Sequence, residues 1–261
     1  MNRIWGIEKI TLSPFYFNSL RLKYVLDALK NVNGKILEIG GGAGAFTRAI
    51  KRCRPDLEII CSDIDSNLIK LAKKMDNKNS YIQADAQKIP FENNYFEAVV
   101  AFDVIEHLQN PEKSFTEIIR VLKNKGVFHT SIPLEGNILT LHGLFLKIGI
   151  KPKEKYAGHI QHFTTKNIIG MLKNAGFLKI GYNFSGHIFY QLVDFSYFSL
   201  LSLLKKKNHH TVEGYVETLP KGVIRTLILV TKLFLSVIIY IESIFLKKMP
   251  GQIGHFSAHK I

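Results

Sequence analysis

Three glycines are the residues of this sequence best placed to bind a ligand through the backbone. Gly40, Gly42 and Gly44 follow a short apolar segment, 35–39, and precede a segment of helical character, 45–52. Glycine at a strand-to-helix turn lets the main chain approach a ligand closely and directs helix N–H groups toward it. The sequence therefore predicts a nucleotide-type binding loop. A P-loop is excluded because the glycines lack the lysine and hydroxyl residue that such a loop requires.

Three acidic residues stand where parts of a nucleoside could be held. Asp63 ends the predicted second strand, 23 positions after Gly40, where a carboxylate can accept both ribose hydroxyls. Glu38 precedes Gly40 by two residues and can face an ammonium group, and Asp85 lies where it can accept from an adenine amino group. These acids favour an ammonium-bearing adenosine over a dinucleotide. The glycine spacing also satisfies the loose nicotinamide fingerprint, so an oxidoreductase stays an alternative.

Strand-like and helix-like segments alternate between residues 34 and 133. The predicted strands are 35–39, 57–62, 81–84, 96–102 and 127–132, and the predicted helices are 45–52, 66–75 and 111–122. Ser66 is the expected N-cap of the second of these helices. Such alternation predicts crossover connections and a parallel sheet with helices on both faces. A further helix, 165–175, a strand, 177–185, and a last strand, 254–260, follow.

At several places the sequence resembles the class I S-adenosylmethionine-dependent methyltransferases, and most of all the broad group that contains the ubiquinone-pathway methyltransferases and the type 11 domain. The matching segments are Leu37–Gly44, Ser62–Asp65, Gln83–Ala86, Phe102–His107, Arg120–Gly126, Gly158–Thr164 and Ala175–Phe177. The resemblance covers residues 20–185. As a set these motifs specify the fold and the cofactor but leave the acceptor open.

The resemblance implies an α/β fold with a doubly wound, mostly parallel seven-stranded sheet and a helical, apolar C-terminal cap. The expected organisation is a lead and helix (1–33), a cofactor-binding core (34–186), an amphipathic helical cap (187–248) and a final strand (249–261).

The same resemblance implies how S-adenosylmethionine is held. Glu38 and the backbone of Gly40, Gly42 and Gly44 would hold the methionine moiety, Asp63 with Ile64 the ribose, Asp85 and Ala86 the adenine, and Phe102 and Asp103 would lie beside the sulfonium.

His107 and His159 are the expected catalytic residues. Methyl transfer from a sulfonium is an in-line displacement, so the protein mainly orients the nucleophile, and a base is needed only where the acceptor must lose a proton. Histidine titrates near neutral pH, which suits a base. His107 follows the fourth predicted strand, whereas His162 is expected to fix the start of the next helix.

A divalent cation is an alternative use of the same residues. Asp103, Glu106 and His107 lie within five positions, and His159 could supply a fourth ligand. Some relatives carry a similar set that binds a metal ion. Because many metal-free relatives share the Glu–His pair, no metal is expected here.

The charge balance predicts an anionic partner. The 261 residues include 35 Lys and Arg against 21 Asp and Glu, a net charge of +14. A lipid surface, a nucleic acid or a phosphorylated substrate would each be attracted.

Cys53 and Cys61 have no metal-ligand spacing, which excludes a disulfide scaffold and favours a reducing cytoplasm. The N-terminus has no unbroken apolar run, so no secretory signal is expected.

The segment 187–248 is very apolar. At 100° per residue, polar side chains near its end fall on one narrow stripe, namely Arg225, Lys232, Ser236, Ser243 and Lys247. The pattern favours an amphipathic helix with a wide apolar face over a membrane span. Two interpretations stay open: helices that cover the pocket or each other, and a surface that meets anionic lipid.

These observations predict a cytoplasmic methyltransferase, with peripheral attachment to the inner membrane surface as a further option. The expected reaction is transfer to oxygen on a small or lipid-linked hydrophobic acceptor. RNA methylation is one alternative, although the lysines are interleaved with aliphatic residues rather than grouped with stacking aromatics. The other is a membrane-surface protein that keeps the fold without turnover, against which the intact acids argue.

Overall fold

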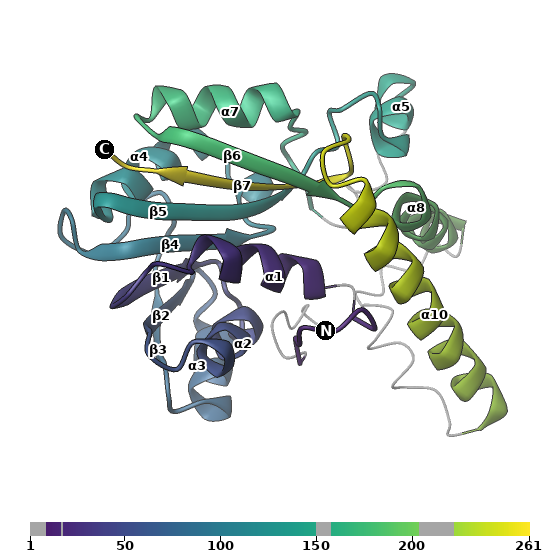
Figure 1. Cartoon of the computed structure of the whole chain (residues 1–261), viewed down its shortest axis with the longest axis horizontal. Coiled ribbons are helices and arrows are strands. Elements are labelled where there is room, and N and C mark those ends of the chain that lie inside the picture. Colours follow the sequence, from purple (N-terminus) through teal and green to yellow (C-terminus); the bar gives the residue numbers. More distant parts are fainter. Residues whose placement is uncertain (1–8, 17, 150–157, 204–221) are drawn as a thin grey trace.

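The computed structural model describes residues 9–16, 18–149, 158–203 and 222–261, which form one sheet with helices on both faces (Figure 1). The strand order is β3-β2-β1-β4-β5-β7-β6. The strands are β1 (Lys35–Ile39), β2 (Glu58–Asp63), β3 (Ser80–Gln83), β4 (Phe96–Phe102), β5 (Leu122–Pro133), β6 (Leu178–Ser185) and β7 (Ile253–His259). Within this sheet β7 runs antiparallel to β5 and β6. The mostly parallel seven-stranded sheet is thus confirmed.

The described helices connect these strands. They are α1 (Ser19–Ala28), α2 (Ala45–Cys53), α3 (Ser66–Met75), the 3₁₀ turn η1 (Ile105–His107), α4 (Pro111–Val121), α5 (Leu141–Lys147), α7 (Thr165–Asn174), α8 (Ile188–Leu203) and α10 (Val223–Phe245). The N-cap of α3 is Asp65, whose side chain accepts from the Asn67 N–H. The prediction of Ser66 as this cap was therefore wrong: the extended backbone falls one residue earlier.

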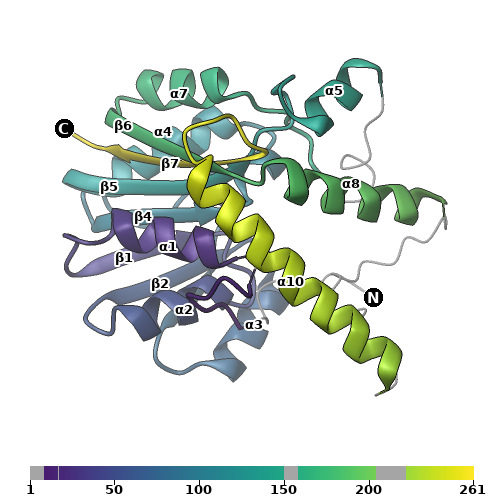
Figure 2. The same ribbon diagram turned by 45° about the vertical axis from the view of Figure 1, so that its right-hand side comes forward.

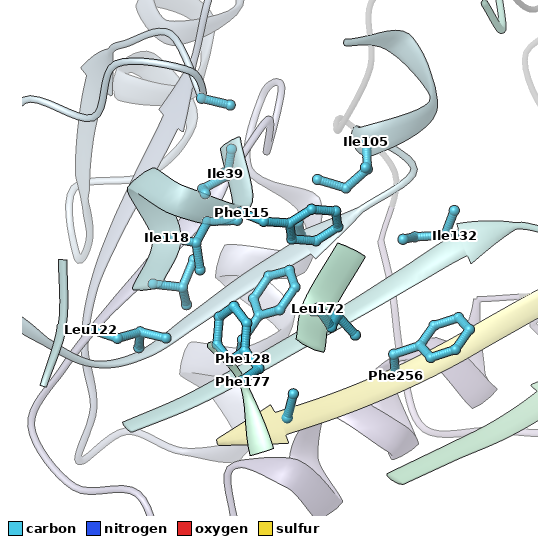
Figure 3. Packing of buried hydrophobic residues seen from close by; sticks show 14 of the residues in the cluster. Ile39, Ile105, Phe115, Ile118, Leu122, Phe128, Ile132, Leu172, Phe177 and Phe256 are labelled. Atoms are coloured by element: carbon cyan, nitrogen blue, oxygen red, sulfur yellow. The ribbon is translucent and has the colours of Figure 1, made fainter. Parts of the chain in front are cut away.

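Alternate residues of the central strands point to opposite faces, and each face has its own core. On one face, Ile36 and Val100 are buried with α1 and α2. On the other, Leu37 and Val99 pack with α4 and α7, where Phe115 and its neighbours fill the layer (Figure 3). Burial on both sides explains why these strands read as nearly unbroken apolar runs.

The parallel strands end at one edge of the sheet, and the site must be sought there. Chain order reverses between β1 and β4, which are hydrogen-bonded neighbours. Ligands of doubly wound folds bind in the crevice at this switch point, outside the carboxyl ends of the strands.

The two C-terminal helices extend beyond this edge. Both α8 and α10 lie between β6 and β7 in the chain, while β7 returns to the sheet between β5 and β6. Figures 1 and 2 show them extending away from the sheet on the side of its carboxyl edge. Among the described helices, the stretch Arg225–Phe245 of α10 is long and apolar enough to cross a membrane by length and composition, with 17% of its most apolar window buried.

Candidate active site

The glycine loop joins β1 to α2 with a backbone that other residues would strain. Gly40, Gly42 and Gly44 have φ angles of +64°, +57° and +83°. A Cβ at Gly40 would collide with the Val104 side chain, and one at Gly44 would lie 2.7 Å from the Tyr81 ring. Glycine is required here for both conformation and space. The loop therefore presents bare main chain at the start of α2.

Asp63 fixes this loop from the end of β2. Its carboxylate accepts from the Gly42 N–H at 2.8 Å through Oδ2 and from the Asp65 N–H at 2.9 Å through Oδ1. A carboxylate has about four acceptor positions, so two remain for a ligand. Asp63 is thus both a support of the loop and an available acceptor.

Glu38 lies behind the loop at the end of β1 and is 2% exposed. Burial raises the pKa of Glu38 to about 7, although hydrogen bonds from Thr47 and the charge of Arg48 oppose the shift. The Thr47 hydroxyl donates to this carboxylate. A buried acid of this kind is stabilised in its ionised form by a cationic ligand group.

The predicted adenine-side residues lie beyond the ends of β2 and β3. Ile64 is 69% exposed, and the Gln83 side chain donates to its carbonyl at 3.1 Å. The Asp85 carboxylate accepts from the Gln87 N–H at 2.8 Å, and Ala86 is nearly buried. The structure therefore brings these residues to the same edge as Asp63.

Phe102 and Asp103, at the end of β4, are placed differently from each other. The Phe102 ring stacks on Phe46 with centroids 3.9 Å apart, inside the core. Asp103 has a φ of +52° and is paired with Arg21 of α1, whose Nη2 donates at 3.0 Å. A non-glycine residue in this region stores strain that its surroundings must hold. The ion pair with Arg21 supplies such a restraint.

His107 and His159 come together beside this edge. Their rings meet edge to face with centroids 4.9 Å apart. His107 Nδ1 lies 3.0 Å from the Gly158 carbonyl, and His159 Nδ1 lies 2.7 Å from Glu135 Oε1. In the tautomer that these acceptors favour, each Nδ1 donates, and in His159 the lone pair then lies on Nε2. His162 also contacts Glu135, at 3.3 Å, so it is not only a helix-start residue.

Glu106 completes a group of potential metal ligands. One ligand atom each of Glu106, His107 and His159 lies within 4.8 Å of the others, the one such group found among the described residues. Both Glu106 oxygens are buried without a hydrogen-bond partner. Burial, reinforced by the Asp103 carboxylate, raises the pKa of Glu106 well above its usual range. Asp103, one of the ligands considered for this cation, lies outside the group and is paired with Arg21.

Glu135 and Arg21 are site residues that the sequence reasoning missed. Glu135 lies just past the carboxyl end of β5, a position that could have marked it as an edge residue. Arg21 comes from α1, which precedes every motif, and nothing in its local sequence indicates a partner 82 positions away.

Comparison with known proteins finds methyltransferases. Residues 37–130 match the family model described as a methyltransferase domain. The chain is 29% identical over 177 residues to the ubiquinone/menaquinone biosynthesis C-methyltransferase UbiE of Stutzerimonas stutzeri, covering 59% of this chain and 69% of that protein. It is 31% identical over 105 residues to the demethylmenaquinone methyltransferase of Thermotoga maritima, covering 40% and 46%. The match thus spans less than half of that second relative.

A solved structure gives the same result for the fold. Phosphoethanolamine N-methyltransferase 2 of Haemonchus contortus, in complex with S-adenosyl-L-methionine, superimposes with a TM-score of 0.57 at 18% identity. The alignment covers 91% of this chain and 52% of that one.

The fold and these matches support a class I S-adenosylmethionine-dependent methyltransferase, as the sequence motifs predicted. The chain is therefore a methyltransferase, an enzyme of a class whose cofactor is S-adenosylmethionine. The nicotinamide alternative and the non-catalytic alternative are not supported.

Proposed function

We propose that this enzyme transfers the methyl group to a hydroxyl oxygen of a small or lipid-linked hydrophobic acceptor. The observation that carries the proposal is His159, whose Nδ1 is held by Glu135 and whose ring lies against that of His107. Transfer to a hydroxyl oxygen requires removal of a proton, and an oriented imidazole is suited to that step.

The cofactor would be held by the residues already described. The main chain of the glycine loop and the Glu38 carboxylate would receive the methionine moiety. Asp63 would accept from the ribose hydroxyls with its two remaining positions, Ile64 would lie beside the adenosine, and Asp85 with Ala86 would face the adenine. Asp103 and the main chain at Phe102 would border the sulfonium. When bound, S-adenosylmethionine supplies a methyl group that is already activated by positive charge.

The protein's own residues then have two tasks. The loop and the acids fix the donor, and orientation of this kind can contribute up to about 7–11 kcal/mol of the barrier. His159 Nε2 would take the acceptor proton, and Glu135, which accepts from Nδ1, would stabilise the resulting imidazolium. His107, which is exposed, would orient the acceptor hydroxyl.

Transfer to carbon is a second candidate, because the relatives from Stutzerimonas stutzeri and others are named C-methyltransferases. A phenolic acceptor deprotonated by His159 would present an electron-rich ring carbon as well as oxygen. The base would then have the same role, and the position of the new methyl group distinguishes the two reactions.

The test is mass spectrometry of lipid and metabolite extracts incubated with the enzyme and isotopically labelled S-adenosylmethionine. We expect label on an oxygen of a hydrophobic product. Label on carbon would support the second candidate, and label on total RNA that falls steeply with salt would support RNA methylation. His159→Gln should lower kcat by about 10²–10⁴-fold with unchanged cofactor binding. His162→Gln, the matched control, should have a much smaller effect.

Treatment with a chelator distinguishes a general base from a bound metal ion as the role of these residues. Without a metal, activity persists after treatment with a chelator. Loss of activity that a divalent cation restores would assign Glu106, His107 and His159 to a cation site.

The proposed location is the cytoplasm, supported by two cysteines that are both free, Cys53 exposed and Cys61 buried.

A further inference from the structure

The helix α10 turns two serines of its polar stripe toward the protein and large apolar side chains outward. Ser236 and Ser243 are 1% and 0% exposed, and Ile239 lies buried between them. A helix on the surface of a globular domain ordinarily does the reverse, with its apolar stripe facing the core. The two serines of the expected polar stripe thus lie on the attachment side of the helix, whereas Lys247 of the same stripe is exposed.

Hydrogen bonds explain this orientation. Ser243 Oγ accepts from the Gly186 N–H at 3.3 Å, and the Lys247 carbonyl accepts from the Phe184 N–H at 2.8 Å. The Glu242 carboxylate accepts from the Ile188 N–H at 3.0 Å and so caps the first turn of α8. The one acidic side chain of α10 therefore satisfies free N–H groups at a helix start. These contacts fix the helix on the end of β6.

The outward side of α10 is a continuous row of large apolar side chains. We call this the apolar face of α10; its members, each between 37% and 82% exposed, are Leu227, Leu229, Val230, Leu233, Phe234, Ile241, Ile244 and Phe245. Ile188, Phe189 and Leu192, at the start of neighbouring α8, are also exposed. Soluble monomers rarely leave contiguous apolar patches of this extent uncovered.

We propose that the apolar face of α10 lies in the interfacial layer of an anionic lipid bilayer. The last turns of the helix are bonded to the domain on one side, so lipid can reach only the other side there, which favours an interfacial helix over a span. The net charge of +14 favours anionic headgroups, and Lys247, two residues past the end of α10, is exposed. Two copies of a chain with this charge repel each other, which disfavours a second copy as the cover.

This arrangement places the carboxyl edge of the sheet next to the bilayer. Figures 1 and 2 both show α8 and α10 on the side where the parallel strands end. A lipid-linked acceptor could then reach His107 and His159 without leaving the lipid completely. That consequence rests on the proposed function, whereas binding of the bilayer does not.

The test is vesicle flotation of the full chain with phosphatidylcholine alone and with added phosphatidylglycerol. We expect flotation with the anionic vesicles and weak binding to the neutral ones. The variant Leu227→Gln/Phe234→Gln/Phe245→Gln should lower the vesicle partition coefficient by about a hundredfold or more, since three large apolar groups no longer enter the lipid. Binding of S-adenosylhomocysteine should be unchanged and shows that the variant is folded.

The matched control replaces three exposed apolar residues at the opposite edge of the sheet, Met75→Gln/Leu178→Gln/Ile261→Gln. It should float like the natural chain. Equal losses in both variants, or no binding to either kind of vesicle, would overturn the proposal. So would a stable dimer that the α10 substitutions dissociate, because a second copy would then cover this face. Resistance of bound protein to alkaline carbonate would indicate a span and overturn the interfacial assignment.

These outcomes separate this inference from the proposed function. Vesicle binding without methylation of any hydrophobic acceptor would support the proposal that α10 binds lipid and would refute the proposed acceptor. Methylation of a hydrophobic acceptor without vesicle binding would support the proposed function and refute the lipid-binding proposal.

Discussion

Replacing Asp63 by alanine tests the cofactor site most directly. Asp63 makes two backbone hydrogen bonds, to Gly42 and Asp65, and has two acceptor positions left. Hydrogen bonds to a charged group contribute about 1.5–3 kcal/mol each. Loss of two such bonds to the ribose costs about 3 kcal/mol at the lower limit, which is a weakening of more than about a hundredfold.

The assay is calorimetric titration of the purified enzyme with S-adenosylhomocysteine. His162→Ala is the control, since His162 contacts Glu135 rather than the glycine loop. It should change the Kd by less than about threefold, well under 1.4 kcal/mol. Asp63→Asn adds a second readout. The amide NH2 group of the new side chain would face the N–H of Gly42 or Asp65 with no acceptor between them, so this variant should also weaken cofactor binding. Equal effects of Asp63→Ala and His162→Ala would refute the ribose assignment.

Three further results are expected. The pKa of Glu38 is about 7 in the folded chain against an ordinary 4.5. The contribution of protonated Glu38 to the free energy of unfolding is therefore complete below pH 4.5 and is lost as the pH rises to 7. Above pH 7, Glu38→Gln should therefore raise the free energy of unfolding of the cofactor-free enzyme, by at most about 3 kcal/mol, and with it the Tm. The same variant should weaken cofactor binding, as a pH series of thermal unfolding and calorimetry would show. Gly40→Ala should destabilise the fold by at least about 1–2 kcal/mol in urea unfolding, because its φ is +64° and Val104 occupies the Cβ position. Glu242→Gln should cost about 0.5–2 kcal/mol by the same measurement, and an unchanged urea midpoint would mean that the α8 cap contributes no stability.

The sheet and the cofactor loop were predictable because their signals are local. Alternating apolar runs and helix-like segments are set by neighbouring residues, and they led to the observed parallel sheet. The left-handed turn at Gly40, Gly42 and Gly44 needs glycine whatever surrounds it, so composition alone marks it. Asp63 could be placed beside this loop because the ends of adjacent parallel strands meet at one edge. The error at Ser66 was a displacement of one residue within the correct turn.

The acceptor side was not predictable to the same degree, because its contacts join distant segments. His107 and His159 were recognised as separate candidates, but their edge-to-face contact depends on how the chain after β5 returns to η1. Arg21 reaches Asp103 only once α1 has packed on the sheet, and this pairing removes Asp103 from the expected cation group.

The sequence by itself determined the alternating α/β pattern, the glycine loop and the acidic residues near it. It also determined that α10 is an amphipathic helix with a polar and an apolar side. The tertiary structure alone decided that the serine side of α10 faces the domain and the apolar side faces out. Hydrophobic periodicity specifies that a helix has two unlike sides, but it does not specify what each side meets. That choice depends on the free N–H groups at the end of β6 and the start of α8, which exist only after the sheet has formed.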